Sequence, residues 1–213
     1  MKPIFCYILS AVIAYFIGSF SFGIIISKLF YKKDIRDFGS HNAGMTNMMR
    51  TFGKGPGIAV FLLDVFKGVI AVLLAKMLFA DFANTLICGY VAALFAIIGH
   101  MYPVYFKFRG GKGVATALGV TTFLAWQTFP IVMIPFAIIA AVSKMVSLAS
   151  IVSAFLLPFA TFVIYKLWYP EFSPIVPTIV TAIIAVIIII FHRSNIKRII
   201  KGEENKIGQS KKK

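Results

Sequence analysis

Two short polar segments have the composition of phosphate-binding loops. The first, Gly39 to Arg50, reads GSHNAGMTNMMR, and the second, Lys107 to Thr116, reads KFRGGKGVAT. Small residues let main-chain N–H groups converge on an anion, and Arg50 offers a planar pair of donors. Lys112 precedes a predicted helix whose first amides attract anions. Phosphate binding is one interpretation. Taken alone, the first segment is equally well an ordinary polar turn with a basic residue, and the second segment is a weak signal.

A third candidate group lies where the last apolar run ends. His192 and Asn195 are three residues apart, which places them on one face of a helix. An interfacial histidine is the simpler interpretation, and a catalytic one is the sharper alternative. The His-x-x-x-x-Asp arrangement of soluble-type acyltransferases is excluded, since the fifth residues after the three histidines are Thr46, Tyr105 and Lys197.

The composition predicts a membrane protein that positions these segments. Of the 213 residues, 60% are hydrophobic, against about 45–50% in soluble domains. Several apolar runs reach the roughly 20 residues that cross a bilayer as a helix, and they lack the alternation of barrel strands. We therefore expect an all-α, polytopic integral membrane helical bundle forming a single domain over residues 1–213.

Seven segments are apolar enough to span, with approximate ranges 4–27, 57–79, 82–101, 113–127, 129–143, 147–167 and 174–192. The stretch 113–143 is either one kinked span or two spans joined by a turn between Ala125 and Phe129. Two spans place most of the 22 basic residues on one side, as the positive-inside rule requires. The expected topology is seven spans with the N-terminus outside and the C-terminus cytoplasmic, the first span being retained rather than cleaved.

The net charge of +15 would suggest nucleic acid in a soluble protein. Here it follows from basic cytoplasmic loops, and no recognition motif supports nucleic acid as a partner. Cys6 and Cys88 lie in apolar segments, so neither a disulfide framework nor a cysteine-based metal site is expected. Asp64 and Lys67 lie within the second span, where a mutual ion pair is the expected arrangement. The lysines at 211–213 suit contact with anionic lipid.

Taken in order, these segments resemble the bacterial acyl-phosphate:glycerol-3-phosphate acyltransferases, the PlsY family. The resemblance rests on motifs distributed along the whole chain, which is more specific than any one of them. They are GSFSFG (18–23), DIRDFGSHNAGMTNMMRTFGKGPG (34–57), LLDVFKG (62–68), GHMYPVYFKFRGGKGVATALG (99–119), SLAS (147–150) and HRSNIKRIIKGEE (192–204).

The resemblance implies transfer of a fatty acyl group from acyl phosphate to the sn-1 hydroxyl of glycerol 3-phosphate, giving lysophosphatidic acid and phosphate, the first step of phospholipid synthesis. It implies seven spans and a site facing the cytoplasm of a bacterial cytoplasmic membrane, with no cofactor or metal. The implied catalytic residues are Ser40, Arg50, Lys112, His192 and Asn195. The implied substrate-binding residues are Asn42, Gly44, Thr46, Asn47, Gly110, Gly111, Gly113, Ser147 and Ser150, and the two serines are not distinguished.

The sequence departs from the family pattern at three positions. His41 stands where glycine is usual, Met45 where a small residue is usual, and Ser21 where proline is common. We therefore do not expect His41 to be the catalytic base, and we expect Met45 to alter the shape of its loop rather than the reaction.

The expected chemistry fits these residue types. An acyl phosphate is a mixed anhydride with a good leaving group, so the protein has to position two anions and stabilise developing oxyanion charge. The proton acceptor is either His192 or a phosphate oxygen of the substrate, and we favour the second. A transporter of organic phosphates is the main alternative, although its binding residues should lie near the bilayer midplane. A purely structural membrane protein is the other alternative.

Overall fold

The computed structural model describes residues 2–207, and the regular elements of that range are helices. The lysines at 211–213 lie outside the described residues. Contacts within the chain divide it into two compact units, with the boundary between Trp126 and Gln127. A single functional domain over 1–213 stays a prediction.

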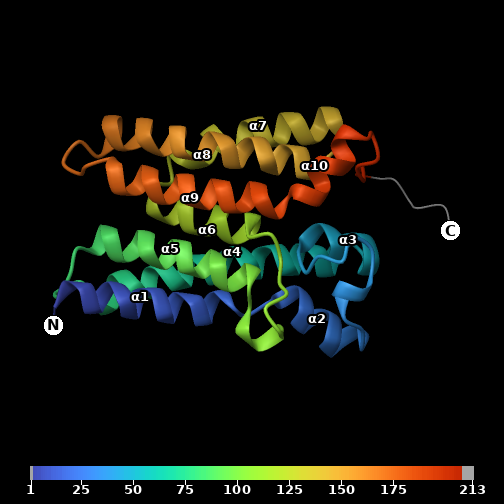
Figure 1. The fold of residues 1–213 in the computed structure, drawn as a ribbon, viewed down its shortest axis with the longest axis horizontal. Helices are drawn as coiled ribbons and strands as arrows, with labels where there is room; N and C mark the ends of the chain where they lie inside the picture. Colours follow the sequence, from blue (N-terminus) through green and yellow to red (C-terminus); the bar gives the residue numbers. More distant parts are fainter. Residues whose placement is uncertain (1, 208–213) are drawn as a thin grey trace. The chain divides into compact units, whose positions relative to one another are not determined.

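The first unit is built from six α-helices and two short 3-10 turns (Figure 1). The elements are α1 (Pro3–Gly18), α2 (Phe22–Tyr31), η1 (Ile35–Asp37), α3 (Met45–Phe52), α4 (Lys54–Leu78), α5 (Thr85–Met101), η2 (Val104–Phe106) and α6 (Val114–Leu124). Helix α4 packs against α1, α5 and α6, and α1 packs along α5.

Small residues bring α1 and α5 into main-chain contact. Gly18 lies against the carbonyl of Ala96, and Gly99 lies against the carbonyl of Tyr15, so neither position has room for a Cβ atom. Close approach of this kind is how helices associate where lipid supplies no hydrophobic driving force. This close packing of α1 against α5 therefore fixes the positions from which the loops after each helix begin.

The second unit contains α7 (Thr128–Ser143), α8 (Val146–Trp168), α9 (Ile175–Phe191) and α10 (Arg193–Ile200). Helix α8 packs against both α7 and α9, and α10 turns away from the α9 axis by 58°. Within this unit the Tyr169 hydroxyl bonds the Gln127 side chain at 3.0 Å, which joins the C-terminal end of α8 to the residue before α7.

Each expected apolar segment is helical in the structure. The predicted turn in 113–143 is confirmed, because α6 ends at Leu124 and α7 begins at Thr128. The first expected span is divided by a break between Gly18 and Phe22, and the N–H and hydroxyl of Ser19 both donate to the Tyr15 carbonyl at the end of α1.

Length and composition identify four stretches able to cross a membrane among the described residues: Pro3–Tyr31, Lys54–Leu78, Thr85–Phe106 and Val146–Trp168. Helices α9 and α10 qualify together as a fifth, bent stretch, and α6 and α7 are apolar but shorter. The count of seven spans and the orientation of the termini therefore stay predictions.

Candidate active site

The first polar loop is held to the second by a single arginine. In η1, Arg36 forms a paired contact with Asp34, with nitrogen–oxygen distances of 2.9 and 2.7 Å. This contact holds the pKa of the Asp34 carboxyl well below its usual range and raises the pKa of Arg36. The same guanidinium donates to the carbonyls of Phe106 (2.8 Å) and Arg109 (3.0 Å), so both loops are fixed at one end of the first unit.

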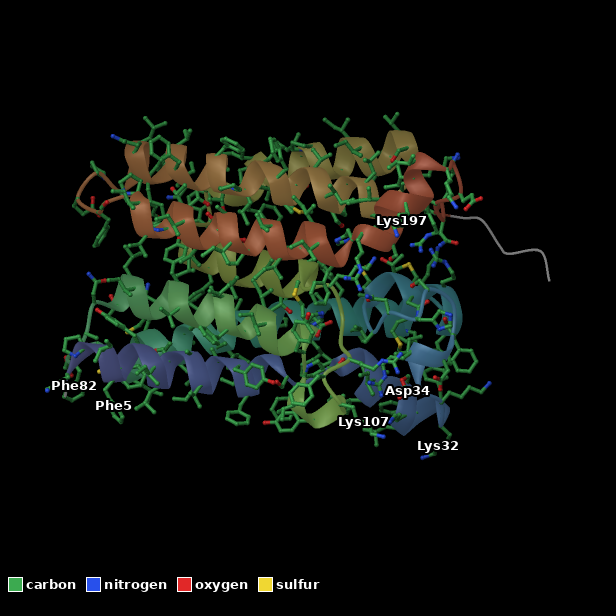
Figure 2. The ribbon with its side chains drawn as sticks, viewed as in Figure 1. Phe5, Lys32, Asp34, Phe82, Lys107 and Lys197 are labelled. Carbon is green, nitrogen blue, oxygen red and sulfur yellow. The ribbon has the colours of Figure 1, made fainter. Side chains whose placement is uncertain are left out.

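The ends of the first unit differ in the side chains they present. Figure 2 shows Phe5 and Phe82 at one end, and Lys32, Asp34 and Lys107 towards the opposite end. The predicted concentration of charged loops at one end of the bundle is therefore present in this unit.

Asn47 organises the first loop from within. Its side-chain NH₂ group lies within hydrogen-bond distance of the carbonyls of Ile35, Phe38 and Asn42 (2.9–3.2 Å), and its oxygen accepts the Ser40 N–H at 2.9 Å. Asn47 is 2% exposed. These contacts give Asn47 the role of shaping the loop, and its predicted direct contact with substrate stays untested.

Helix α3 presents the remaining candidates on its outer face. Thr46 and Arg50 are one helical turn apart and exposed, whereas Met48 is buried in a small apolar cluster beneath the loop. Gly44 precedes the helix, and its N–H donates to the Asn42 side chain at 2.9 Å. Thr46 and Arg50 are therefore placed to meet a solute, while Asn42 stabilises the turn before them.

His41 adopts a left-handed backbone conformation with φ of 56°. Its ring Nδ1 lies 2.9 Å from the carbonyl of Arg36 within the same loop. Glycine adopts this conformation without strain, which gives a physical reason for the glycine usual at this position in the resembled family. The contact supports the expectation that His41 is not the catalytic base.

The second loop closes on itself before α6 begins. The N–H groups of Gly110 and Gly111 donate to the carbonyls of Met101 and His100, both at 3.1 Å. Gly113 has φ of 81° and precedes α6, and Lys112 lies half-buried beside it. The structure therefore confirms that GGKG leads into a helix start.

In the second unit, a buried carboxylate gathers three side chains. One oxygen of Glu204 accepts from Ser147 (3.0 Å) and Asn195 (2.7 Å), and the other accepts from Arg198 (2.8 Å). Ser150 instead bonds the Val146 carbonyl of its own helix at 2.9 Å. Ser147 is thus the serine of SLAS that joins the Asn195 cluster.

His192 lies at the bend between α9 and α10 rather than within either helix. Its Nδ1 lies 2.8 Å from the Ile188 carbonyl, so in the neutral ring Nδ1 carries the hydrogen. The Ile188 carbonyl thus helps to orient this ring. His192 and Asn195 are both buried near the bend, at 3% and 5% exposure.

Sequence reasoning missed Arg36 and Glu204 as organising residues. Arg36 is one of several basic residues in a loop expected to be cytoplasmic, although its spacing from Asp34 is a local signal. Glu204 is an acidic residue in a segment rich in lysine and arginine, and this composition is a signal that it pairs with a nearby basic side chain. The predicted Asp64–Lys67 ion pair is confirmed at 2.8 Å, with both side chains buried.

The fold and these loops define a helical membrane protein with basic, glycine-rich loops suited to anions. The family model described as glycerol-3-phosphate acyltransferase matches residues 8–202. The chain belongs to this family, and it is a multi-pass membrane acyltransferase.

Two curated relatives, both called glycerol-3-phosphate acyltransferase, come from Staphylococcus aureus strains bovine RF122 / ET3-1 and JH9. Each is 44% identical over 208 residues, covering 94% of this chain and 97% of the relative.

The fold is also similar to two crystal structures of PlsY, an integral membrane glycerol 3-phosphate acyltransferase, each 35% identical to this chain. The glycerol 3-phosphate form has a TM-score of 0.81 and covers 95% of this chain and 96% of that one. The lysophosphatidic acid form has a TM-score of 0.79 and covers 95% of each chain.

Proposed function

We propose that this protein transfers a fatty acyl group from acyl phosphate to the sn-1 hydroxyl of glycerol 3-phosphate. The products are lysophosphatidic acid and inorganic phosphate. Membership of the family supports the acceptor, and the similar crystal structures are of forms with glycerol 3-phosphate and with lysophosphatidic acid. We further propose a bacterial cytoplasmic membrane location, with the polar loops facing the cytoplasm.

The observation that carries the proposal is the link made by Arg36. Two loops of anion-binding composition are held together at one end of one unit. A reaction between two anions needs two anion-binding loops close to each other, because effective concentration and orientation account for much of the acceleration of a bimolecular reaction. An enzyme with a single phosphate site has no need of the second loop.

Arg50, Lys112 and Ser40 are the residues we assign to anion binding and to stabilising the developing oxyanion. Thr46 and Gly113 belong to the same assignment through their hydroxyl and main-chain groups. The N–H groups of Gly44, Gly110 and Gly111 bond within the chain, so we assign these glycines to shaping the substrate-binding loops. From the second unit we assign Ser147, His192 and Asn195 to the reaction. Asn42 and Asn47 contribute indirectly, by holding the shape of the first loop. Glu204 contributes indirectly, by accepting hydrogen bonds from Ser147 and Asn195.

The proposed reaction forms one bond and breaks one bond at the acyl carbon. The hydroxyl oxygen of glycerol 3-phosphate adds to the acyl carbonyl, whose oxygen gains negative charge. The bond from the acyl carbon to the phosphate oxygen then breaks, and phosphate leaves with the electron pair. Positively charged donors that bind this charge more tightly in the transition state lower the barrier.

We assign the hydroxyl proton to a phosphate oxygen of the acyl donor. The ring of His192 donates from Nδ1 to the Ile188 carbonyl, a neutral partner that stabilises an imidazolium less than a carboxylate would. This contact favours a role for His192 in hydrogen bonding substrate over a role as the obligatory base.

Purified protein with palmitoyl phosphate and glycerol 3-phosphate tests this function. We expect release of phosphate and formation of lysophosphatidic acid in equal amounts, and no product when acyl-CoA replaces acyl phosphate. Product from acyl-CoA alone would refute the proposed donor. Uptake of glycerol 3-phosphate into proteoliposomes without acyl transfer would instead identify a transporter.

A further inference from the structure

A buried polar cluster lies inside the first unit, apart from the residues assigned above. It consists of Asp64 and Lys67 on α4 and His100 on α5, with exposures between 1% and 3%. The Lys67 nitrogen lies 2.8 Å from an Asp64 carboxylate oxygen, 2.8 Å from the Phe20 carbonyl and 2.8 Å from Nδ1 of His100.

The contact with Lys67 indicates which nitrogen of the His100 ring carries the hydrogen. An ammonium group donates hydrogen bonds and cannot accept one, and the Lys67 nitrogen lies 2.8 Å from Nδ1 of His100. Nδ1 of His100 is therefore an acceptor, and the hydrogen of the neutral ring is on Nε2. The network thus assigns both the tautomer and the orientation of the imidazole.

The cluster also joins three elements of the first unit, one of which, α5, leads into the second loop. Phe20 lies in the break between α1 and α2, so Lys67 links that break to α4 and, through His100, to the end of α5. Charged residues placed inside a membrane-spanning helix are costly and commonly serve function. A bundle that needed only packing at this place would be served by apolar side chains.

His100 lies directly against the glycine pair of the second loop. A Cβ atom on Gly111 would collide with Nε2 of the ring, and one on Gly110 would collide with the His100 carbonyl. That carbonyl also accepts the Gly111 N–H at 3.1 Å. The ring and main chain of His100 therefore occupy the space that side chains at these two positions would need.

We propose that Asp64, Lys67 and His100 are positioning residues for the Gly110–Gly113 loop. Lys67 holds the His100 ring with its Nε2 edge on Gly111, and the ring sets where the loop amides and Lys112 meet a phosphate group. This inference rests on the proposed function, because it assigns phosphate binding to that loop. It makes two predictions about the His100–Gly111 contact that do not depend on catalysis.

A double-mutant cycle between His100→Ala and Gly111→Ala tests the contact. The added methyl group of Gly111→Ala displaces the ring, so we expect the dissociation constant for inorganic phosphate to rise at least tenfold. In the His100→Ala background the ring is gone, and the same substitution should change that constant less than about twofold. Equal fold-changes in the two backgrounds would overturn the proposal.

Gly55→Ala is the matched control, because a Cβ there meets nothing within 4 Å and the residue is exposed. Its phosphate affinity should equal that of the unmodified protein, and its melting temperature should be equal or slightly higher, because alanine favours the helix in which residue 55 lies. Thermal unfolding is recorded for every variant. A purely structural contact would lower melting temperatures while leaving the phosphate affinity of the folded fraction unchanged, and that result also counts against the proposal.

The role of Lys67 is tested without leaving a buried charge unpaired. The double variant Asp64→Asn, Lys67→Met removes both charges together, whereas Lys67→Arg keeps a donor-rich cation. We expect at least tenfold weaker phosphate binding from the first and a smaller change from the second. Should the double variant not fold, the His100–Gly111 cycle decides the proposal alone, and folded protein with unchanged phosphate affinity refutes it.

Two results separate this inference from the proposed function. Failure of the unmodified protein to make lysophosphatidic acid would refute the proposed function, whereas additive effects in the cycle would refute only the positioning role.

Nitrogen-15 NMR of histidine-labelled protein reports the tautomer of His100 directly. We expect the ring nitrogen chemical shifts of His100 to be those of the tautomer with the hydrogen on Nε2. Shifts typical of the tautomer with the hydrogen on Nδ1 would contradict the Lys67 contact.

Discussion

Arg36 donates a hydrogen bond to the carbonyl of Phe106, 70 residues further along the chain, with a nitrogen–oxygen distance of 2.8 Å. The same side chain is paired with Asp34, so its geometry is fixed from both sides. Charge-assisted bonds in paired geometry are among the stronger and more directional contacts in proteins. This arginine therefore makes the relative position of two separate loops a property of the fold.

Replacing Arg36 with lysine should separate the loops while keeping the charge. Lysine cannot reach Asp34 and two carbonyls with a planar fork, so we expect kcat/KM to fall about 10- to 100-fold, which corresponds to roughly 1.5–3 kcal/mol. Steady-state rates with both substrates measure this. Lys54→Ala, at an exposed position nearby, is the control and should retain full activity. A normal rate for Arg36→Lys would show that the link is dispensable.

The Asp34 carboxyl predicts a pH dependence of stability. Its pKa is held below the unfolded value, mainly by the Arg36 side chain, so its contribution is present above about pH 4 and is lost as the pH falls through the folded pKa. At pH 7, Asp34→Asn should be less stable by roughly 1 kcal/mol after allowance for solvent screening, or about 2–4 °C in melting temperature. The difference should shrink below pH 4. A constant difference across the acid range would contradict this account.

Ser147 and Ser150 should respond differently to loss of their hydroxyl groups. Ser147→Ala removes a donor to Glu204 and leaves the carboxylate with fewer partners, so we expect at least a tenfold lower kcat. Ser150→Ala removes only a bond to its own helix and should change the rate less than about threefold. Rates and melting temperatures of the two variants, measured side by side, check this. The reverse order would place Ser150 in the site.

His192→Ala tests which group accepts the proton. If a phosphate oxygen is the acceptor, the variant should keep measurable activity, with a loss of about 10- to 1000-fold from the missing hydrogen bond. Added imidazole should then have no effect, and the KM for glycerol 3-phosphate should rise. Near-total loss at normal substrate affinity, with activity restored by imidazole, would instead make His192 the base.

His41→Gly should be tolerated or stabilising. The left-handed conformation of His41 carries strain of about 1 kcal/mol for a residue with a Cβ atom, which glycine relieves. The contact of the ring with the Arg36 carbonyl is lost in exchange. We expect a melting temperature equal to or up to about 4 °C above that of the unmodified protein, at full activity. A large loss of activity would give His41 a role in the reaction.

The sequence by itself determined the class of fold and the residue types of the site. Apolar runs as long as a bilayer is thick admit few structures other than helices, so the segments and the turn between Ala125 and Phe129 followed from composition. The resemblance along the whole chain likewise identified the family and the expected acceptor substrate, since ordered motifs are a property of sequence. Neither the class of fold nor the family depends on which side chains contact each other in the folded protein.

Only the tertiary structure decided how the side chains are used. The Asn47 side chain points into its own loop and bonds the Ile35 carbonyl. Ser147 bonds Glu204 whereas Ser150 bonds its own helix, and Arg36 bonds the Phe106 carbonyl. The bonds of Arg36 to Phe106 and of Ser147 to Glu204 join groups 70 and 57 residues apart, at 2.8 and 3.0 Å. The formation of such a bond depends on backbone positions set by helix packing, which residue type and local spacing do not encode.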